Sequence, residues 1–89
     1  MRAVIAVIGK DMVGILANVS QKCAEYSINV TEVTQSVLQD MFAMIMMVDM
    51  SKSTVPVATL SDELSKIGDK MGLKIYVMHE DIFNSMHKI

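Results

Sequence analysis

Residues 3–16 read AVIAVIGKDMVGIL, and this stretch decides the fold because two periodicities meet in it. Its first part, Ala3–Ile8, is continuously apolar and β-branched, which predicts a strand that is buried on both faces. Gly9 ends this run. From Met12 onward, apolar residues recur at helical spacing, which predicts an amphipathic helix with Asp11 as its N-cap. The stretch is therefore a strand, a short loop and the start of a helix.

Two further apolar segments follow this helix closely. Residues 28–38 are rich in Val and Thr, and the phase of their apolar residues shifts between Val30 and Val33, which indicates a strand with a bulge. Only residues 39–40 separate this strand from a fully apolar run at residues 41–50. The two segments therefore predict a hairpin.

A second helix and a last strand complete the pattern. Ser53 or Thr54 is expected to cap this helix, and Pro56 is expected to lie in its first turn. Apolar residues then step by three and four until Gly72, a typical residue after the end of a helix. Residues 73–78 alternate in the way expected of a half-buried strand.

The order strand, helix, strand, strand, helix, strand predicts an α+β, ferredoxin-like βαββαβ fold within a single domain, residues 1–89. This fold has a four-stranded antiparallel sheet with both helices on one face. Residues 41–50 are apolar at both odd-numbered and even-numbered positions, so the strand presents apolar side chains to both faces of the sheet. The face without helices is therefore also expected to be covered. A second subunit and the tail, residues 81–89, as a short amphipathic helix, are the two alternatives. A composition of 52% hydrophobic and 20% charged residues favours a homodimer.

Charge and hydropathy limit the classes of partner and the cellular compartment that we expect for this protein. The net charge is −2 and no basic cluster is present, so we expect no nucleic-acid partner. The first apolar run is too short for a signal peptide or a membrane span. We therefore expect a cytoplasmic protein that does not bind a membrane.

Several chemistries lack the residues that they require. Gly9 and Gly14 have the spacing of a phosphate-binding loop, but Ile15 stands where that loop has lysine. Cys23 is the single cysteine, so a Cys-x-x-Cys metal site is missing, and the methionines of residues 41–50 alternate between two faces. No side chain has the neighbours of an activated nucleophile. We expect no enzyme activity, no catalytic residue, no metal site and no cofactor.

The loop before the first helix is the remaining candidate for a functional site. Glycine inside a first helical turn costs about 1 kcal/mol relative to alanine, so Gly14 is expected to have a compensating role. Without a side chain there, a ligand carboxylate or a second chain can approach the N–H groups at the positive end of the helix. Ligand binding and close packing remain alternatives at this point.

The motif Gly9-Lys10-Asp11-Met12-Val13-Gly14-Ile15, followed by Ile28-Asn29-Val30, resembles the signature of the ACT domain. The resemblance covers nearly the whole chain. It is closest to small stand-alone ACT-domain proteins, several of which end in a segment like Glu80-Asp81-Ile82-Phe83, and it extends to the ACT modules of the glycine-cleavage repressor and of formyltetrahydrofolate deformylase.

The resemblance implies a ferredoxin-like, non-catalytic, regulatory module that binds a small ligand, in particular an amino acid, between the subunits of a homodimer. It implies that Asp11 binds the ammonium group of the ligand and that Asn29 binds its carboxylate or amide. The implied ligand-binding residues are Asp11, Met12, Val13, Gly14, Ile15 and Asn29. The chain has Val13 where the family commonly has proline, and Gly9 where some serine-binding members have histidine. The alternative function is an interaction module that docks on a metabolic enzyme or regulator without a small ligand.

Overall fold

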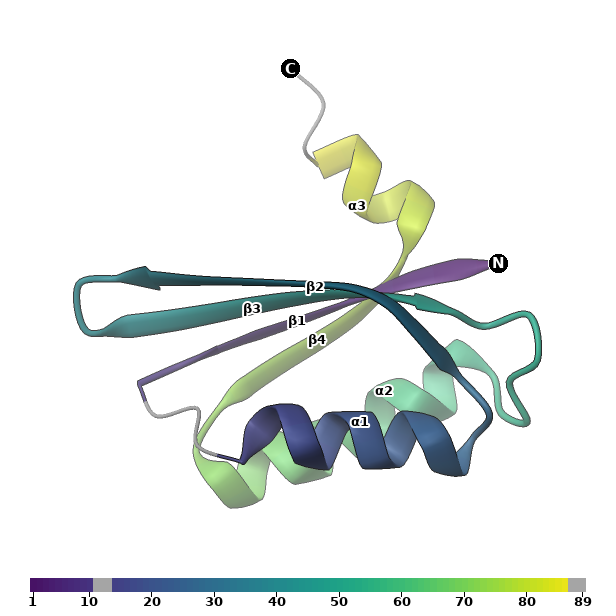
Figure 1. Ribbon diagram of the computed structural model, residues 1–89, viewed down its shortest axis with the longest axis horizontal. Coiled ribbons are helices and arrows are strands. Elements are labelled where there is room, and N and C mark those ends of the chain that lie inside the picture. The colour runs from purple at the N-terminus through teal and green to yellow at the C-terminus, as the bar shows by residue number, and fades with distance from the viewer. Residues whose placement is uncertain (11–13, 87–89) are drawn as a thin grey trace.

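The computed structural model describes residues 1–10 and 14–86. The elements are β1 (Arg2–Gly9), α1 (Ile15–Glu25), β2 (Asn29–Leu38), β3 (Met41–Asp49), α2 (Val57–Met71), β4 (Lys74–His79) and α3 (Glu80–Met86). The four strands form one antiparallel sheet in the order β2-β3-β1-β4. Helices α1 and α2 lie on one face of this sheet, and α3 lies on the other (Figure 1). The predicted α+β, ferredoxin-like fold is confirmed.

The core lies between the sheet and the helices α1 and α2. Alternate residues of β1 and β3 point into it, as their apolar runs predict. Ile5, Met44 and Met46 are among the largest fully buried side chains. From the helices, Val19 and Leu64 meet them in the same cluster. The core therefore unites residues from both halves of the chain.

The two helix starts differ from the prediction. α1 begins at Ile15 with Gly14 in the N-cap position, while the predicted cap, Asp11, lies outside the described residues. α2 begins only after Pro56, which has an extended backbone, so neither Ser53 nor Thr54 caps it. The Ser53 hydroxyl instead donates to the Val55 carbonyl and accepts from the Val55 N–H, which forms a turn ahead of the helix.

The irregularity predicted in the second strand is confirmed. The register between β2 and β3 shifts between Val30 and Glu32, so Thr31 is the extra residue of a bulge. Its hydroxyl donates to the carbonyl of Met47 over 3.1 Å. Beyond the bulge, β2 and β3 continue together to a tight turn in which Gln39 has a positive φ of 58°. A hairpin forms there without glycine.

The sheet face opposite α1 and α2, here called the open face, is apolar in its middle. Pairing of β3 with β1 and of β1 with β4 places Ile45, Ala6 and Tyr76 in one row across it. Helix α3 contacts β1 and β4 at one end of this face, where Val4 is fully buried. At the other end Ile8 is exposed. The tail thus covers part of the second face. This is one of the two alternatives, tail or second subunit, that the sequence left open.

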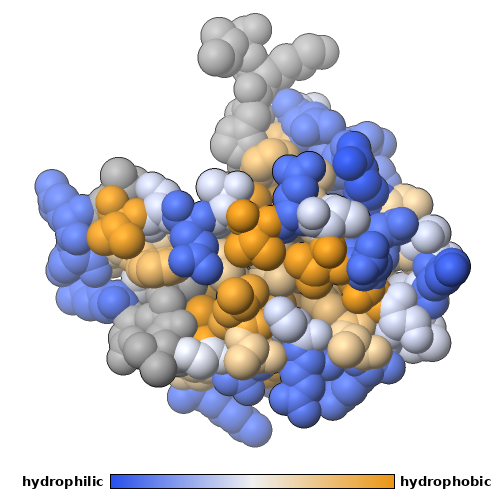
Figure 2. Space-filling view, viewed as in Figure 1, coloured by the Kyte–Doolittle hydropathy of each residue, from blue (hydrophilic) through white to orange (hydrophobic). Residues whose placement is uncertain are grey.

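A second apolar surface follows the outer edge of β2 and the flank of α1. It is formed by Leu16, Val33 and Val37, all of which are exposed, Val37 by 65%. This surface, here called the β2-edge surface, belongs to the side of the molecule that Figure 2 shows, where apolar side chains gather between hydrophilic ones. The sheet therefore has one unpaired edge that carries large apolar side chains.

Candidate functional site

The predicted site begins where β1 ends, at Gly9. A Cβ atom at this position would lie 1.9 Å from Cδ2 of Leu73, so the leucine side chain occupies the space that any other residue would need. Gly9 is buried and Leu73 belongs to the core. The first glycine of the motif is therefore explained by packing between β1 and Leu73, the residue before β4.

The second glycine of the motif has a backbone role. Gly14 has φ of 79°, in the left-handed region where residues with a Cβ atom are strained. Its carbonyl accepts from the Asn18 N–H over 3.0 Å and from the Asn18 side-chain amide over 2.8 Å. The prediction that Gly14 lies inside the first helical turn is wrong, because the helix begins one residue later. Glycine is required by the turn that enters α1.

The other predicted residues of this loop are placed only in part. Asp11, Met12 and Val13 lie outside the described residues. The Ile15 side chain is 1% exposed and packs in the core, so a ligand at this loop would meet its backbone and not its side chain. The N–H groups at the start of α1 carry the positive end of the helix dipole, which favours an anionic ligand group nearby.

Asn29, the remaining predicted residue, lies at the far end of the same side of the molecule. It pairs with Asp49, which pairs with Arg2 at the start of β1, whereas Gly9 ends that strand. Helix α1, with 11 residues and a length of about 16 Å, runs between the two parts of the site. Within one chain, the structure does not bring Gly14 and Asn29 together.

Asn29 lines a small polar hollow of about 190 Å³. Its other lining residues are Ser27, Asp49, Ser51 and Lys52. The Asp49 carboxylate accepts from the Ser51 N–H over 2.9 Å, and the bonds from Ser51 lower the pKa of this carboxyl. The residues that line the hollow thus carry a carboxylate, an ammonium group and an amide, which together can form hydrogen bonds with a small polar ligand.

The sequence alone did not point to these four additional residues. For three of them the signal was present as a polar stretch, Asp49 to Lys52 apart from Met50, at the end of an apolar strand. Only the pairing of Asn29 with Asp49 shows that this stretch meets the start of β2.

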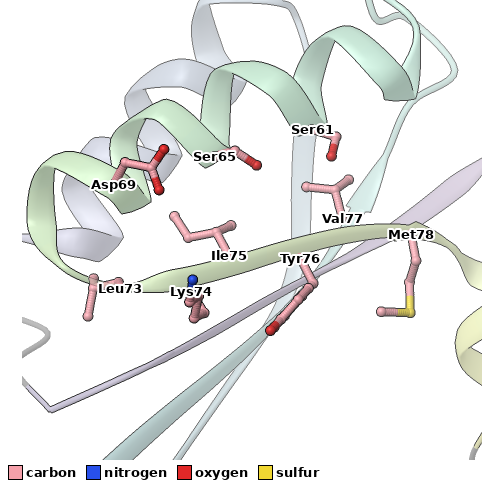
Figure 3. A pocket seen from close by; sticks show the side chains of 9 residues that line it. All are labelled: Ser61, Ser65, Asp69, Leu73, Lys74, Ile75, Tyr76, Val77 and Met78. Carbon is pink, nitrogen blue, oxygen red and sulfur yellow. The ribbon is translucent and has the colours of Figure 1, made fainter.

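A larger hollow, of about 430 Å³, lies between α2 and β4 (Figure 3). In Figure 3, side chains from α2 form its upper wall and those of β4 its lower wall. It contains none of the residues predicted from the motif.

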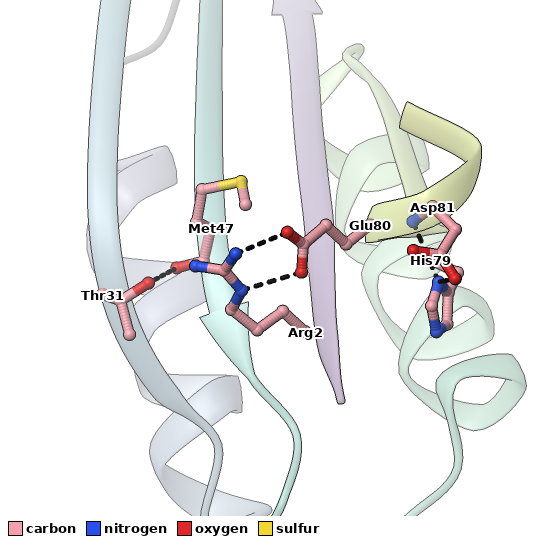
Figure 4. A network of polar contacts seen from close by, with 6 residues as sticks. All are labelled: Arg2, Thr31, Met47, His79, Glu80 and Asp81. Atoms are coloured by element: carbon pink, nitrogen blue, oxygen red, sulfur yellow. Dashed lines mark hydrogen bonds and ion pairs between the residues drawn. The ribbon is translucent and has the colours of Figure 1, made fainter. Parts of the chain in front are cut away.

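An ion pair with two hydrogen bonds joins the start of β1 to α3. The Arg2 guanidinium donates to both oxygens of the Glu80 carboxylate, with 2.7 Å between Nε and Oε2 (Figure 4). This arrangement lowers the pKa of Glu80 and raises that of Arg2. Beside it, Nδ1 of His79 accepts from the Asp81 N–H over 3.0 Å. The network attaches α3 to the open face.

Catalytic or metal chemistry gains no support from the part of the chain that the structure describes. There, no three His, Cys, Asp or Glu side chains are grouped in a way that would hold a metal ion. Cys23 is buried, and burial raises the pKa of its thiol, which disfavours the reactive thiolate. Nor is any helix within residues 14–86 long and apolar enough to cross a membrane.

Comparison with known proteins agrees with the fold and identifies the family. Residues 2–78 match the family model of the ACT domain. A UPF0237 protein of Methanopyrus kandleri is 44% identical over 88 residues, which cover 99% of this chain and 98% of that protein. A UPF0237 protein of Listeria innocua is 46% identical over the full length of both chains.

Solved structures show the same architecture. An ACT domain protein from Streptococcus pneumoniae superposes with a TM-score of 0.80 and 36% identity, over 93% of each chain. A formyltetrahydrofolate deformylase from Pseudomonas syringae pv. tomato superposes with a TM-score of 0.76 and 18% identity, over 88% of this chain and 27% of that one, and so shares the fold alone. The resemblance predicted from the motif is confirmed, and the chain belongs to the ACT-domain family.

Proposed function

We propose that this chain is a non-catalytic regulatory module that binds an amino acid as a homodimer. The observation that carries the proposal is the placement of the two parts of the site. Helix α1 and strand β2 form one side of the molecule. The start of α1 lies at one end of this side, and Asn29 lies at the other. One chain leaves each part without the other, so a complete site requires a second copy.

A two-fold axis beside β2, perpendicular to the sheet, would join the parts. Such an axis places the β2 strands of two copies antiparallel to each other and α1 next to its copy. The start of α1 in one copy would then lie near Asn29 of the other. The association would bury the β2-edge surface of both copies, including Val33 and Val37, which α1 leaves exposed.

The proposed ligand contacts follow from charge. The resemblance assigns the ammonium group of the ligand to Asp11 and its carboxylate or amide to Asn29. The start of α1 offers backbone N–H groups to the carboxylate as well. The hollow beside Asn29 adds the Lys52 ammonium and the Asp49 carboxylate. All five groups would recognise the polar part that amino acids share.

Calorimetric titration of the standard amino acids tests the proposal. We expect at least one to bind, with Asp11→Ala and Asn29→Ala each weakening it by tenfold or more, the effect of one lost charged hydrogen bond. Asp62→Ala, an exposed carboxylate on α2, serves as the control and should leave binding unchanged. Binding by none of the amino acids, or undiminished binding by Asp11→Ala, contradicts the proposed site.

Mixing the two defective variants tests whether the site is shared between subunits. A mixed dimer contains one site with both Asp11 and Asn29 intact and one site with neither. After random reassortment, about a quarter of the wild-type sites should be restored. If Asp11 and Asn29 acted within one chain, mixing would restore none.

The apolar open face supports the second candidate function, docking on a metabolic enzyme or regulator. Ile8 and Tyr76 are exposed there, and Tyr76 by 51%. An interaction module would retain its partner from a cell extract without added amino acids and would lose it in Ile45→Glu. Retention that depends on an added amino acid would favour the ligand-binding function instead.

A further inference from the structure

Strand β4 has a free edge beside a helix. In the sheet order β2-β3-β1-β4 it pairs with β1 on one side, and within the described chain no strand pairs with its other side. Helix α2 runs alongside, and the hollow of about 430 Å³ lies between the two (Figure 3). An edge strand flanked by a helix is an arrangement to which an extended peptide can add as a further strand.

The wall of this groove on the α2 side has a regular chemistry. Ser61, Ser65 and Asp69 line it at intervals of four residues, which places them in one row along the helix. Two small polar side chains are thus followed by one carboxylate. In the part of the chain that the structure describes, Asp69 has no ion-pair partner, whereas Glu63 on the same helix is paired with Lys66.

The floor and the lower wall of the groove come from β4. Ile75 and Val77 point toward α2, and Lys74, Tyr76 and Met78 point to the opposite side of the strand (Figure 3). A Cβ atom on Gly68 would lie 2.9 Å from the Leu73 carbonyl, so this glycine lets α2 pack directly against the start of β4. The helix is therefore held at a fixed place beside the free edge.

We propose that this groove binds an extended segment of a partner polypeptide, which adds antiparallel to β4 as a fifth strand. Backbone hydrogen bonds would hold the segment, and alternate side chains would lie beside α2. Charge complementarity predicts two adjacent residues of this segment. An acidic residue would face Lys74 across the strand pair, and the next residue, a basic one, would lie beside Asp69. Small or β-branched residues would precede them.

A second copy of β4 fits this edge less well. Antiparallel pairing of β4 with its own copy, with side chains on matching faces, places Lys74 opposite Tyr76, Met78 or Glu80, depending on the register. The first two leave the lysine without a counter-charge, and Glu80 is already bonded to Arg2. A lysine on an edge strand is also a common means of discouraging self-pairing.

A designed peptide supplies the probe. Acetyl-Val-Val-Thr-Val-Glu-Lys-amide has valines for the α2 side, glutamate for Lys74 and lysine for Asp69. Its control has the last two residues exchanged, so composition and net charge are the same. Titration of the full-length protein, followed by backbone amide NMR, should give saturable shifts along β4 and α2, with affinity for the exchanged peptide about fivefold weaker.

Variants of the protein test the charged contact. Asp69→Lys should weaken the binding of the designed peptide by about fivefold. Asp62→Lys makes the same change on α2 outside the groove, and it should leave the affinity unchanged. Equal affinity of Asp69→Lys and the wild type for the designed peptide overturns the proposal.

N-methylation of the peptide tests strand addition itself. In an antiparallel pair, only alternate residues direct their N–H groups to the neighbouring strand. Methylating the odd-numbered or the even-numbered amides should therefore abolish binding in one case and preserve it in the other. Equal tolerance of both, absence of saturable shifts at millimolar peptide, or shifts of β4 with protein concentration alone, which indicate self-pairing, each overturn the proposal.

Discussion

At the residue scale, each glycine of the family motif has its own structural reason. Gly9 gives up its side-chain space to Leu73, and Gly14 adopts a left-handed backbone at the entry to α1. Neither reason requires a ligand. Gly14 nevertheless sets the direction in which the first N–H groups of α1 point. The turn therefore prepares the helix end that the proposed ligand would use.

Substitution of Gly14 should reveal its backbone conformation. Gly14→Ala places a Cβ atom on a residue with φ of 79°, and within residues 1–10 and 14–86 only Asn18 Nδ2 lies near that atom, at 3.8 Å, so backbone strain is the main cost. We expect a loss of about 1 kcal/mol in the free energy of unfolding, measured in denaturant. Gly14→Asn should lose less, because asparagine tolerates this region better. An alanine variant as stable as the wild type would contradict the left-handed turn.

At Gly68, by contrast, the cost of a larger side chain comes from steric contact with neighbouring atoms and not from the backbone angle φ. In Gly68→Ala the added methyl group would lie 2.9 Å from a backbone oxygen and 3.2 Å from Ile75 Cγ1. Overpacking costs about 1–3 kcal/mol, and better helix propensity returns about 1. We expect net destabilisation in thermal or denaturant unfolding, while Ser65→Ala, one turn away and exposed, changes stability by about 0.5 kcal/mol or less. Stabilisation by Gly68→Ala would show that α2 and β4 can separate freely.

At the scale of elements, α3 differs from the other two helices. It has seven residues, follows β4 without a linker and lies on the open face. A helix of this length does not hold its shape alone in water, so its contacts with β1 and β4 must stabilise it. The ion pair between Arg2 and Glu80 is the charged part of that attachment.

The attachment of α3 should depend on pH. Arg2 lowers the pKa of Glu80 in the folded state, so the pair stabilises docking fully above the ordinary glutamate pKa of about 4.3. This contribution is lost as the pH falls below that value toward the lowered pKa. Methyl NMR signals of Val4 and Ile82 should report undocking on acidification.

Glu80→Gln should weaken docking near neutral pH and flatten this pH profile. Glu63→Gln, on α2, is the matched control and should retain the wild-type profile of the Val4 signals. An unchanged profile in Glu80→Gln would show that another group attaches α3.

At the scale of the whole molecule, the sheet has two edges and two faces with different surroundings. α1 and α2 cover one face, and α3 covers one end of the other. The β2 edge carries the large apolar side chains, and the β4 edge carries a groove with polar side chains of α2. The proposed homodimer uses the first edge and leaves the second free for a partner.

Association through the β2 edge makes a prediction for sedimentation. Val37→Glu places a charge within the proposed interface and should weaken dimerisation by tenfold or more. Tyr76→Glu, at a position on the open face that is also exposed, is the control and should leave the monomer–dimer equilibrium unchanged. A larger effect of Tyr76→Glu would place the interface on the open face, and a wild-type monomer at high micromolar concentration would exclude the homodimer.

The sequence by itself determined the order of elements, the bulge in β2, the two faces of β3 and the family. These features depend on periodicity and on local motifs, which are written in consecutive residues. It did not determine where α1 and α2 begin, because the entry turn at Gly14 and the turn at Ser53 replace the expected side-chain caps.

Only the tertiary structure decided which residues meet. The pairing of Asn29 with Asp49, the separation of Asn29 from Gly14 and the groove beside β4 all follow from strand order and register. Such contacts join residues far apart in the chain, and the burial that selects them is a property of the whole sheet and its helices. The residues of the proposed site could be named from the sequence, but their separation within one chain could not.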